Sequence, residues 1–181
     1  MFVTIYLPNF YLQAALRYRG DERPAFLTQP VALIDERDKK PFILQLNAAA
    51  DSFGVRQGMS PSQGLARCLS LAILTRSALQ EKALNEILLH QAFTLTPYVE
   101  ATAPGLCTAQ VNDTRNLTAK VSRLIDQLAA CAVTAQAGLG PAPDTSFLAA
   151  HLAQPILQIE DAHQFLAPLP IEILAVDVDN L

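Results

Sequence analysis

The sequence predicts a mixed fold of the α/β or α+β class. Hydrophobic residues make up 51% of the 181 positions and charged residues 17%, which indicates a well-filled core rather than a disordered chain. Short runs rich in β-branched and aromatic residues alternate with segments of helical periodicity. The length suits one domain of ordinary size, or a domain that carries a small inserted lobe.

Proline, glycine and capping residues mark where these elements begin and end. Pro8 stops the first strand, residues 2–7, because proline has no N–H to donate to a neighbouring strand. Ser60 is a helix cap, since Pro61 suits the first turn and Gln63 can complete a capping box. The remaining boundaries follow from similar signals.

The expected elements alternate along the chain. Strands are predicted near 2–7, 31–34, 42–46, 71–74, 97–102, 106–111, 131–138 and 156–159. Helices are predicted near 10–19, 47–53, 60–68, 77–93, 114–129, 144–153 and 160–166. The charged segment Arg17–Gln29, which contains proline, is expected to be mostly a connection.

Charge and cysteine content limit the class of protein. A net charge of −4 and a pI near 5.3 show no excess of Lys and Arg, which argues mildly against tight DNA binding by this segment. Three scattered cysteines, Cys68, Cys107 and Cys131, fit reduced thiols in a cytoplasmic protein better than disulfides or a metal site. The apolar runs are too short for a membrane span, so we expect a cytoplasmic protein without membrane contact.

Three segments, in this order, carry a family resemblance. The first runs from Asn47 through Phe53-Gly54-Val55 and Gly58-Met59-Ser60 towards Cys68. The second is Leu95–Glu100 and the third is Phe165–Pro170. Together they resemble the palm and fingers of Y-family translesion DNA polymerases, the UmuC-like proteins, over residues 2–176.

The resemblance implies a fold and a domain division. It implies a polymerase palm, with a mostly antiparallel sheet and helices on one face, and a small inserted fingers lobe. Residues 1–20 and 75–170 would form the palm and residues 21–74 the fingers lobe. Residues 171–181 would be the truncated start of a thumb.

The resemblance also locates the positions of the catalytic carboxylates. Polymerases use two divalent metal ions held by carboxylates. The three family positions fall on Tyr6, Gly105 and Leu106, and residues 101–111 contain no Asp or Glu. We therefore expect no bound metal, no cofactor and no enzymatic activity, with Tyr6 as a packed aromatic at a strand end.

The nucleotide-binding positions of the family look equally altered. A Tyr and an Arg that contact the triphosphate fall on Ala48 and Asp51, and an aspartate would repel a triphosphate. A palm lysine falls near Ser146, and Tyr11 occupies the place of the steric-gate aromatic as a vestige of it. The three histidines, His90, His151 and His163, lack metal-ligand spacing and are expected at surface or boundary positions.

This pattern resembles most closely the ImuB-type branch of the family. The resemblance implies a non-catalytic scaffold or adaptor in DNA repair and error-prone translesion synthesis. Its partners would be damaged DNA, bound weakly by this segment, and a sliding clamp and an error-prone replicative-type polymerase, reached through regions outside this chain. Two alternatives remain: an active Y-family polymerase that uses other acids, and an unrelated α/β interaction domain.

Overall fold

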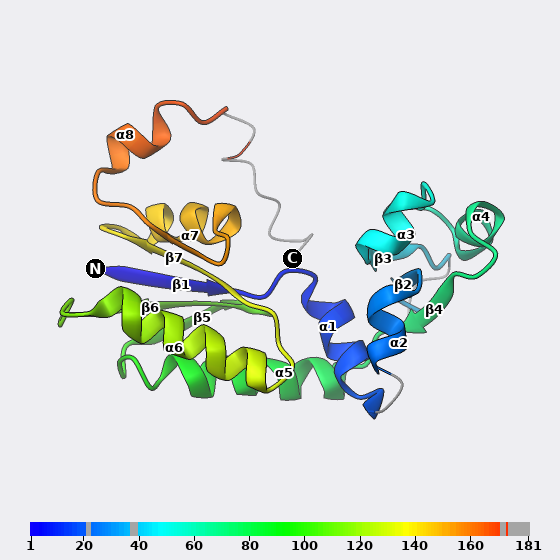
Figure 1. Ribbon diagram of the computed structural model, residues 1–181, viewed down its shortest axis with the longest axis horizontal. Helices are drawn as coiled ribbons and strands as arrows, with labels where there is room; N and C mark the ends of the chain where they lie inside the picture. The colour runs from blue at the N-terminus through cyan, green and yellow to red at the C-terminus, as the bar shows by residue number, and fades with distance from the viewer. Residues whose placement is uncertain (21–22, 37–39, 171–172, 174–181) are drawn as a thin grey trace. The chain divides into compact units, whose positions relative to one another are not determined.

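The chain divides into two units in a computed structural model that describes residues 1–20, 23–36, 40–170 and 173. The larger unit comprises Met1–Pro8 and Leu84–Leu181, and the smaller comprises Asn9–Ala83 (Figure 1). The predicted start of a thumb, residues 171–181, lies outside the described residues except for Ile173.

A five-stranded sheet forms the centre of the larger unit. Its strands are β1 (Phe2–Tyr6), β5 (Val99–Ala103), β6 (Leu106–Gln110), β7 (Gln136–Gly140) and β8 (Ile156–Gln158). Their order is β5-β6-β1-β7-β8, and every pairing is antiparallel except that of β7 with β8. The predicted fold class, with a mostly antiparallel sheet, is confirmed.

Helices lie against both faces of this sheet. They are α5 (Ala78–Ala92), α6 (Leu117–Ala130) and α7 (Pro143–Leu152), whereas the short helix α8 (Ala162–Leu166) follows β8 and buries none of its residues. Figure 1 shows α5 and α6 on one side of the strands and α7 on the other, whereas the family resemblance implied helices on one face only. Strand β1 alternates accordingly, since Val3 and Ile5 are fully buried apolar residues, whereas Thr4 Oγ1 is 2.8 Å from Ser146 Oγ of α7.

Helix α7 approaches β7 closely because β7 carries glycine there. A Cβ atom on Gly138 would meet Ser146 O and Ala150 N far inside van der Waals contact. It would also lie 2.7 Å from the carbonyl carbon of Ala149. Only a residue without a side chain therefore fits between this strand and the helix backbone.

The smaller unit is built on a three-stranded sheet. Its strands are β2 (Val31–Ile34), β3 (Ile43–Leu46) and β4 (Ala72–Thr75), in the order β3-β2-β4. Strand β2 is buried along its whole length and pairs antiparallel with β3 and parallel with β4. Its helices are α1 (Phe10–Arg17), α2 (Arg23–Thr28), α3 (Ala48–Ser52) and α4 (Pro61–Arg67).

Helix α2 corrects one prediction from the sequence. The segment Arg17–Gln29 was expected to be mostly a connection, but residues 23–28 are helical. Pro24 is the second residue of this helix, where the N–H that proline lacks would have no partner within the helix. Proline there does not break the helix.

Side-chain caps begin both α3 and α4. The predicted capping box is confirmed, since Gln63 N donates to Ser60 Oγ at 3.2 Å and Ser60 N to Gln63 Oε1 at 2.8 Å. Asn47 caps α3 by accepting from Ala50 N at 2.9 Å, and it also accepts from Val31 N at 3.0 Å. Its side-chain Nδ2 donates to the Gln29 carbonyl at 2.8 Å, which ties three segments together.

Within the described residues, the helices are too short or too polar to cross a membrane.

Candidate functional site at the end of strand β1

The structure brings together the three residues that sequence comparison placed at the catalytic positions. Tyr6, the last residue of β1, lies directly opposite Leu106, the first residue of β6. Leu7 N donates to the Gly105 carbonyl at 2.9 Å, just beyond this pair. Gly105 has a φ of 75° in the turn between β5 and β6, and its N–H donates to Asn85 Oδ1 of α5 at 3.0 Å.

The His151 ring of α7 stacks on Tyr6, and the Phe147 ring of the same helix lies beside His151. The Tyr6 and His151 rings are stacked, with centroids 4.2 Å apart and planes 23° from parallel. The Phe147 ring lies 4.5 Å from His151 on its own helix. The expectation that Tyr6 is a packed aromatic at a strand end agrees with this geometry.

Sequence reasoning missed the role of His151. Its Nδ1 lies 2.9 Å from the Phe147 carbonyl, which it can contact only as a donor, so Nε2 is the unprotonated nitrogen of the neutral ring. Nε2 is buried and has no hydrogen-bond partner among the described residues. The only signal in the sequence is the i, i+4 spacing of Phe147 and His151, which places them on one helix face.

Stability should depend on pH through His151. Burial lowers the pKa of its imidazole below the ordinary value of about 6.5, despite the opposing hydrogen bond to Phe147. The unfolded chain therefore binds the proton first as pH falls, and the folded state loses stability below about pH 6.5. Urea unfolding at pH 7.5 and 5.5 should show this loss, and His151→Phe should reduce it.

If His151→Phe loses as much stability between pH 7.5 and pH 5.5 as the unaltered chain does, His151 is not the cause of the pH dependence. His163→Phe is the control, because His163 is exposed on α8, and it should leave the pH dependence unchanged.

None of the three residues at this strand end has a carboxylate side chain. Tyr6 presents a phenol whose pKa is raised by burial, Gly105 has no side chain, and Leu106 is fully buried. The neighbouring Cys107 is fully buried, and burial raises the pKa of its thiol to about 12, so it is not a thiolate at neutral pH. The described part of the chain holds no group of three or more His, Cys, Asp or Glu side chains suited to a metal ion.

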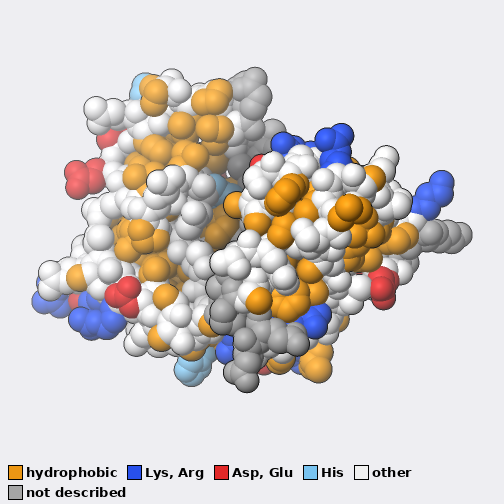
Figure 2. Space-filling model, turned by 45° about the vertical axis from the view of Figure 1, so that its right-hand side comes forward, with side chains coloured by type: hydrophobic (Ala, Val, Ile, Leu, Met, Phe, Trp, Pro, Cys, Tyr) orange, Lys and Arg blue, Asp and Glu red, His pale blue; other side chains and the backbone are white. Residues whose placement is uncertain are grey.

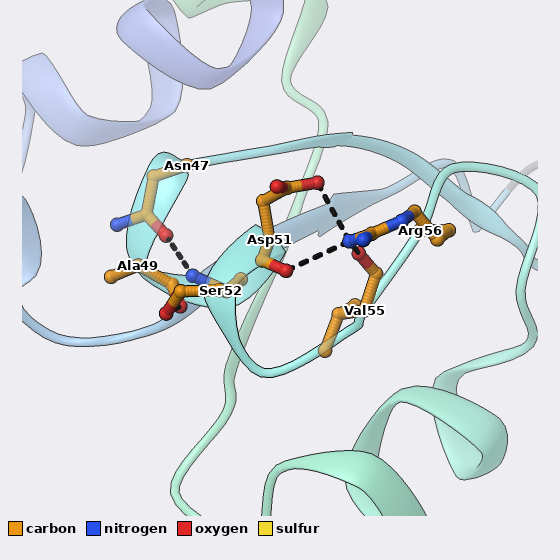
Figure 3. A network of polar contacts seen from close by, with 7 residues as sticks. Asn47, Ala49, Asp51, Ser52, Val55 and Arg56 are labelled. Carbon is orange, nitrogen blue, oxygen red and sulfur yellow. Dashed lines mark hydrogen bonds and ion pairs between the residues drawn. The ribbon is translucent and has the colours of Figure 1, made fainter.

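The predicted nucleotide-contacting positions lie in the smaller unit. Ala48 is the first residue of α3, and Asp51 of the same helix pairs with Arg56 at 2.7 Å (Figure 3). Arg56 Nη1 also donates to the carbonyls of Asp51 and Val55, each at 2.8 Å. The negative charge of Asp51 is thus offset by a neighbouring arginine, which the sequence-based argument about repulsion did not include.

Tyr11, at the steric-gate position, is covered by a cation. The Arg76 guanidinium lies 3.8 Å from the centroid of the Tyr11 ring. Arg76 makes two 2.8 Å bonds to Glu81 and one of 3.2 Å to Asp35, and the bond to Glu81 is the main reason that its pKa is raised. This arrangement holds the Tyr11 ring in a fixed position.

Ser146, near the position of the family's palm lysine, takes part in packing. It is fully buried, and its Oγ donates to the Pro143 carbonyl at 2.8 Å beside its contact with Thr4. These contacts leave it turned towards the sheet.

The comparison with protein families identifies this arrangement. Residues 5–152 match the model of the impB/mucB/samB family. The chain belongs to this family. The predicted relationship to the UmuC-like proteins is thereby confirmed, and the unrelated interaction domain is excluded. No curated protein sequence matches the chain.

Solved structures share the fold of this family member. An insertion ternary complex of Dbh DNA polymerase matches with a TM-score of 0.81 at 15% identity, over 95% of this chain and 53% of that one. A post-insertion binary complex of the same polymerase matches with a TM-score of 0.83 at 14% identity, over 95% and 52%. DinB from Sulfolobus solfataricus matches with a TM-score of 0.79 at 14% identity, over 96% and 53%.

These matches contradict one prediction. The chain was expected not to be an enzyme, but the structures that it resembles are described as DNA polymerases. The prediction rested on Tyr6, Gly105 and Leu106, which form one end of one sheet. The chain spans about half the length of the matched structures, so three side chains do not determine the activity of a whole protein.

Proposed function

We propose that this chain is the palm and fingers of a Y-family polymerase-like protein that binds DNA in damage tolerance and translesion synthesis. The larger unit would be the palm and the smaller unit the fingers lobe. The observation that carries the proposal is the family match over residues 5–152, in a chain whose strand ends meet at Tyr6 and Leu106. The DNA-bound complexes among the matched structures support DNA as the ligand.

We propose that the protein also acts as an adaptor in translesion synthesis. Metal ions at a polymerase site need carboxylate ligands, and Tyr6, Gly105 and Leu106 supply none. Ligands for nucleotidyl transfer by this protein would have to come from other residues. The adaptor would bring a sliding clamp and an error-prone polymerase to damaged DNA through regions outside this chain.

Two experiments test the proposal. Deleting the gene from its host should lower the frequency of mutations induced by ultraviolet light, and an unchanged frequency would contradict a role in translesion synthesis. Primer extension by the full-length protein with Mg²⁺ or Mn²⁺ then separates the two roles. Template-directed extension would mean that the protein is a polymerase whose metal ligands lie at other positions. A contribution to mutagenesis without any extension would support the adaptor role.

A further inference from the structure

The two units carry charge of opposite sign. Residues 9–83 contain ten Lys and Arg against seven Asp and Glu, a net charge of +3. The rest of the chain contains three against ten, a net charge of −7. The overall charge of −4 is therefore the sum of a basic unit and an acidic unit. A polyanion would bind the basic unit more strongly than the acidic one.

An exposed aromatic ring and an exposed arginine lie together in the basic unit. Phe53 follows α3 with 56% of its surface exposed. Arg67 ends α4, is exposed, and reaches the turn next to Phe53, because its Nη1 would lie 3.2 Å from a Cβ atom on Gly54. We call Phe53, Arg56 and Arg67 the Phe53–Arg67 patch.

Arg67 differs from its neighbour Arg56 in how its charge is used. Arg56 is paired with Asp51 and bonded to two carbonyls (Figure 3). Arg67 has no acidic partner among the residues that the structure describes. Figure 2 shows Lys and Arg side chains beside hydrophobic side chains on the face of the molecule that it presents.

We infer that the Phe53–Arg67 patch binds single-stranded nucleic acid, with Arg67 on a phosphate and a base stacked on Phe53. Surfaces that bind single strands combine cations that follow the backbone with exposed aromatic rings on which bases stack. A duplex keeps its bases stacked internally and would have no use for the Phe53 ring. The inference rests on the proposed function and specifies which unit, and which form of nucleic acid, it uses.

Fluorescence anisotropy with the 181-residue chain tests this inference. The probe is fluorescein-labelled oligothymidine of about 20 nucleotides, longer than the ~4–16 nucleotides that a single-strand site usually covers. Phe53→Ala should weaken binding at least about fivefold, the lower limit for loss of one stacked base. Arg67→Gln should reduce the slope of log affinity against log salt by about 0.7, as expected for one lost phosphate contact.

Matched controls come from the acidic unit. Phe93 is 54% exposed and Arg123 is exposed on α6, so Phe93→Ala and Arg123→Gln remove the same groups from equally accessible positions. Both should bind the probe within about twofold of the unaltered chain. Arg67→Lys should retain the salt slope, and circular dichroism of each variant shows whether it is folded.

Three other outcomes would contradict the inference, and they show whether the patch alone or also the proposed function is wrong. If the chain binds a primer–template duplex but the patch variants bind oligothymidine as tightly as the controls do, the patch is wrong and the proposed function stands. A duplex of equal length that binds more tightly and responds equally to Phe53→Ala would exclude stacking of an unpaired base. Absence of binding to any of these DNAs would count against both proposals.

Discussion

Gly138→Ala should destabilise the larger unit by about 3 kcal/mol or more, at the upper end of the cost of overpacking a core. The added methyl group would run into the backbone of α7 at Ser146 and Ala150. Backbone atoms in a helix cannot move aside individually, so α7 as a whole would have to shift away from β7 and β1. Urea unfolding monitored by circular dichroism measures the change.

Gly64→Ala is the matched control. Its new Cβ atom would lie 2.9 Å from Ile43 Cδ1 and Leu71 Cδ2, which are the ends of flexible side chains. The gain in helix propensity in α4, about 1 kcal/mol, should offset that crowding. Equal losses of stability in the two variants would contradict the claim that contact with backbone decides the cost.

Asn47→Ala should destabilise the smaller unit by about 2–3 kcal/mol. The substitution removes the cap of α3 and leaves the N–H groups of Val31 and Ala50 without their acceptor. The Gln29 carbonyl also loses its donor. Urea unfolding again gives the magnitude.

Asn47→Asp separates the contributions of the two ends of the amide. The carboxylate still accepts from Val31 and Ala50 but cannot donate to Gln29, so the loss should be smaller than for alanine. A loss as large as that of Asn47→Ala would show that the bond to Gln29, rather than the cap, provides most of the stabilisation.

Local signals in the sequence predicted much of the fold. The Ser60–Gln63 capping box and the stop at Pro8 both depend on residues close to one another in the chain, and each lies where it was expected. Helix α2 was missed because charge and a proline resemble a connection, although proline near a helix start is compatible with the helix.

The candidate site was predicted in part. The family resemblance placed Tyr6, Gly105 and Leu106 at one site, and the strand register brings them together. The stacking of His151 on Tyr6, the Arg76 contact with Tyr11 and the Asp51–Arg56 pair were not predicted. Asp51 and Arg56 are only five residues apart, but their pairing depends on the turn after α3.

The sequence by itself determined the fold class, the family resemblance and the residues at the end of β1, because these depend on composition, local periodicity and motif order. Only the tertiary structure decided what surrounds those residues. Packing of α7 on β1 joins His151 to Tyr6 across 145 positions of sequence, and no local pattern encodes a contact of that range. The division into a basic and an acidic unit likewise required the three-dimensional boundary at residues 8–9 and 83–84, since the net charge of the whole chain averages the two.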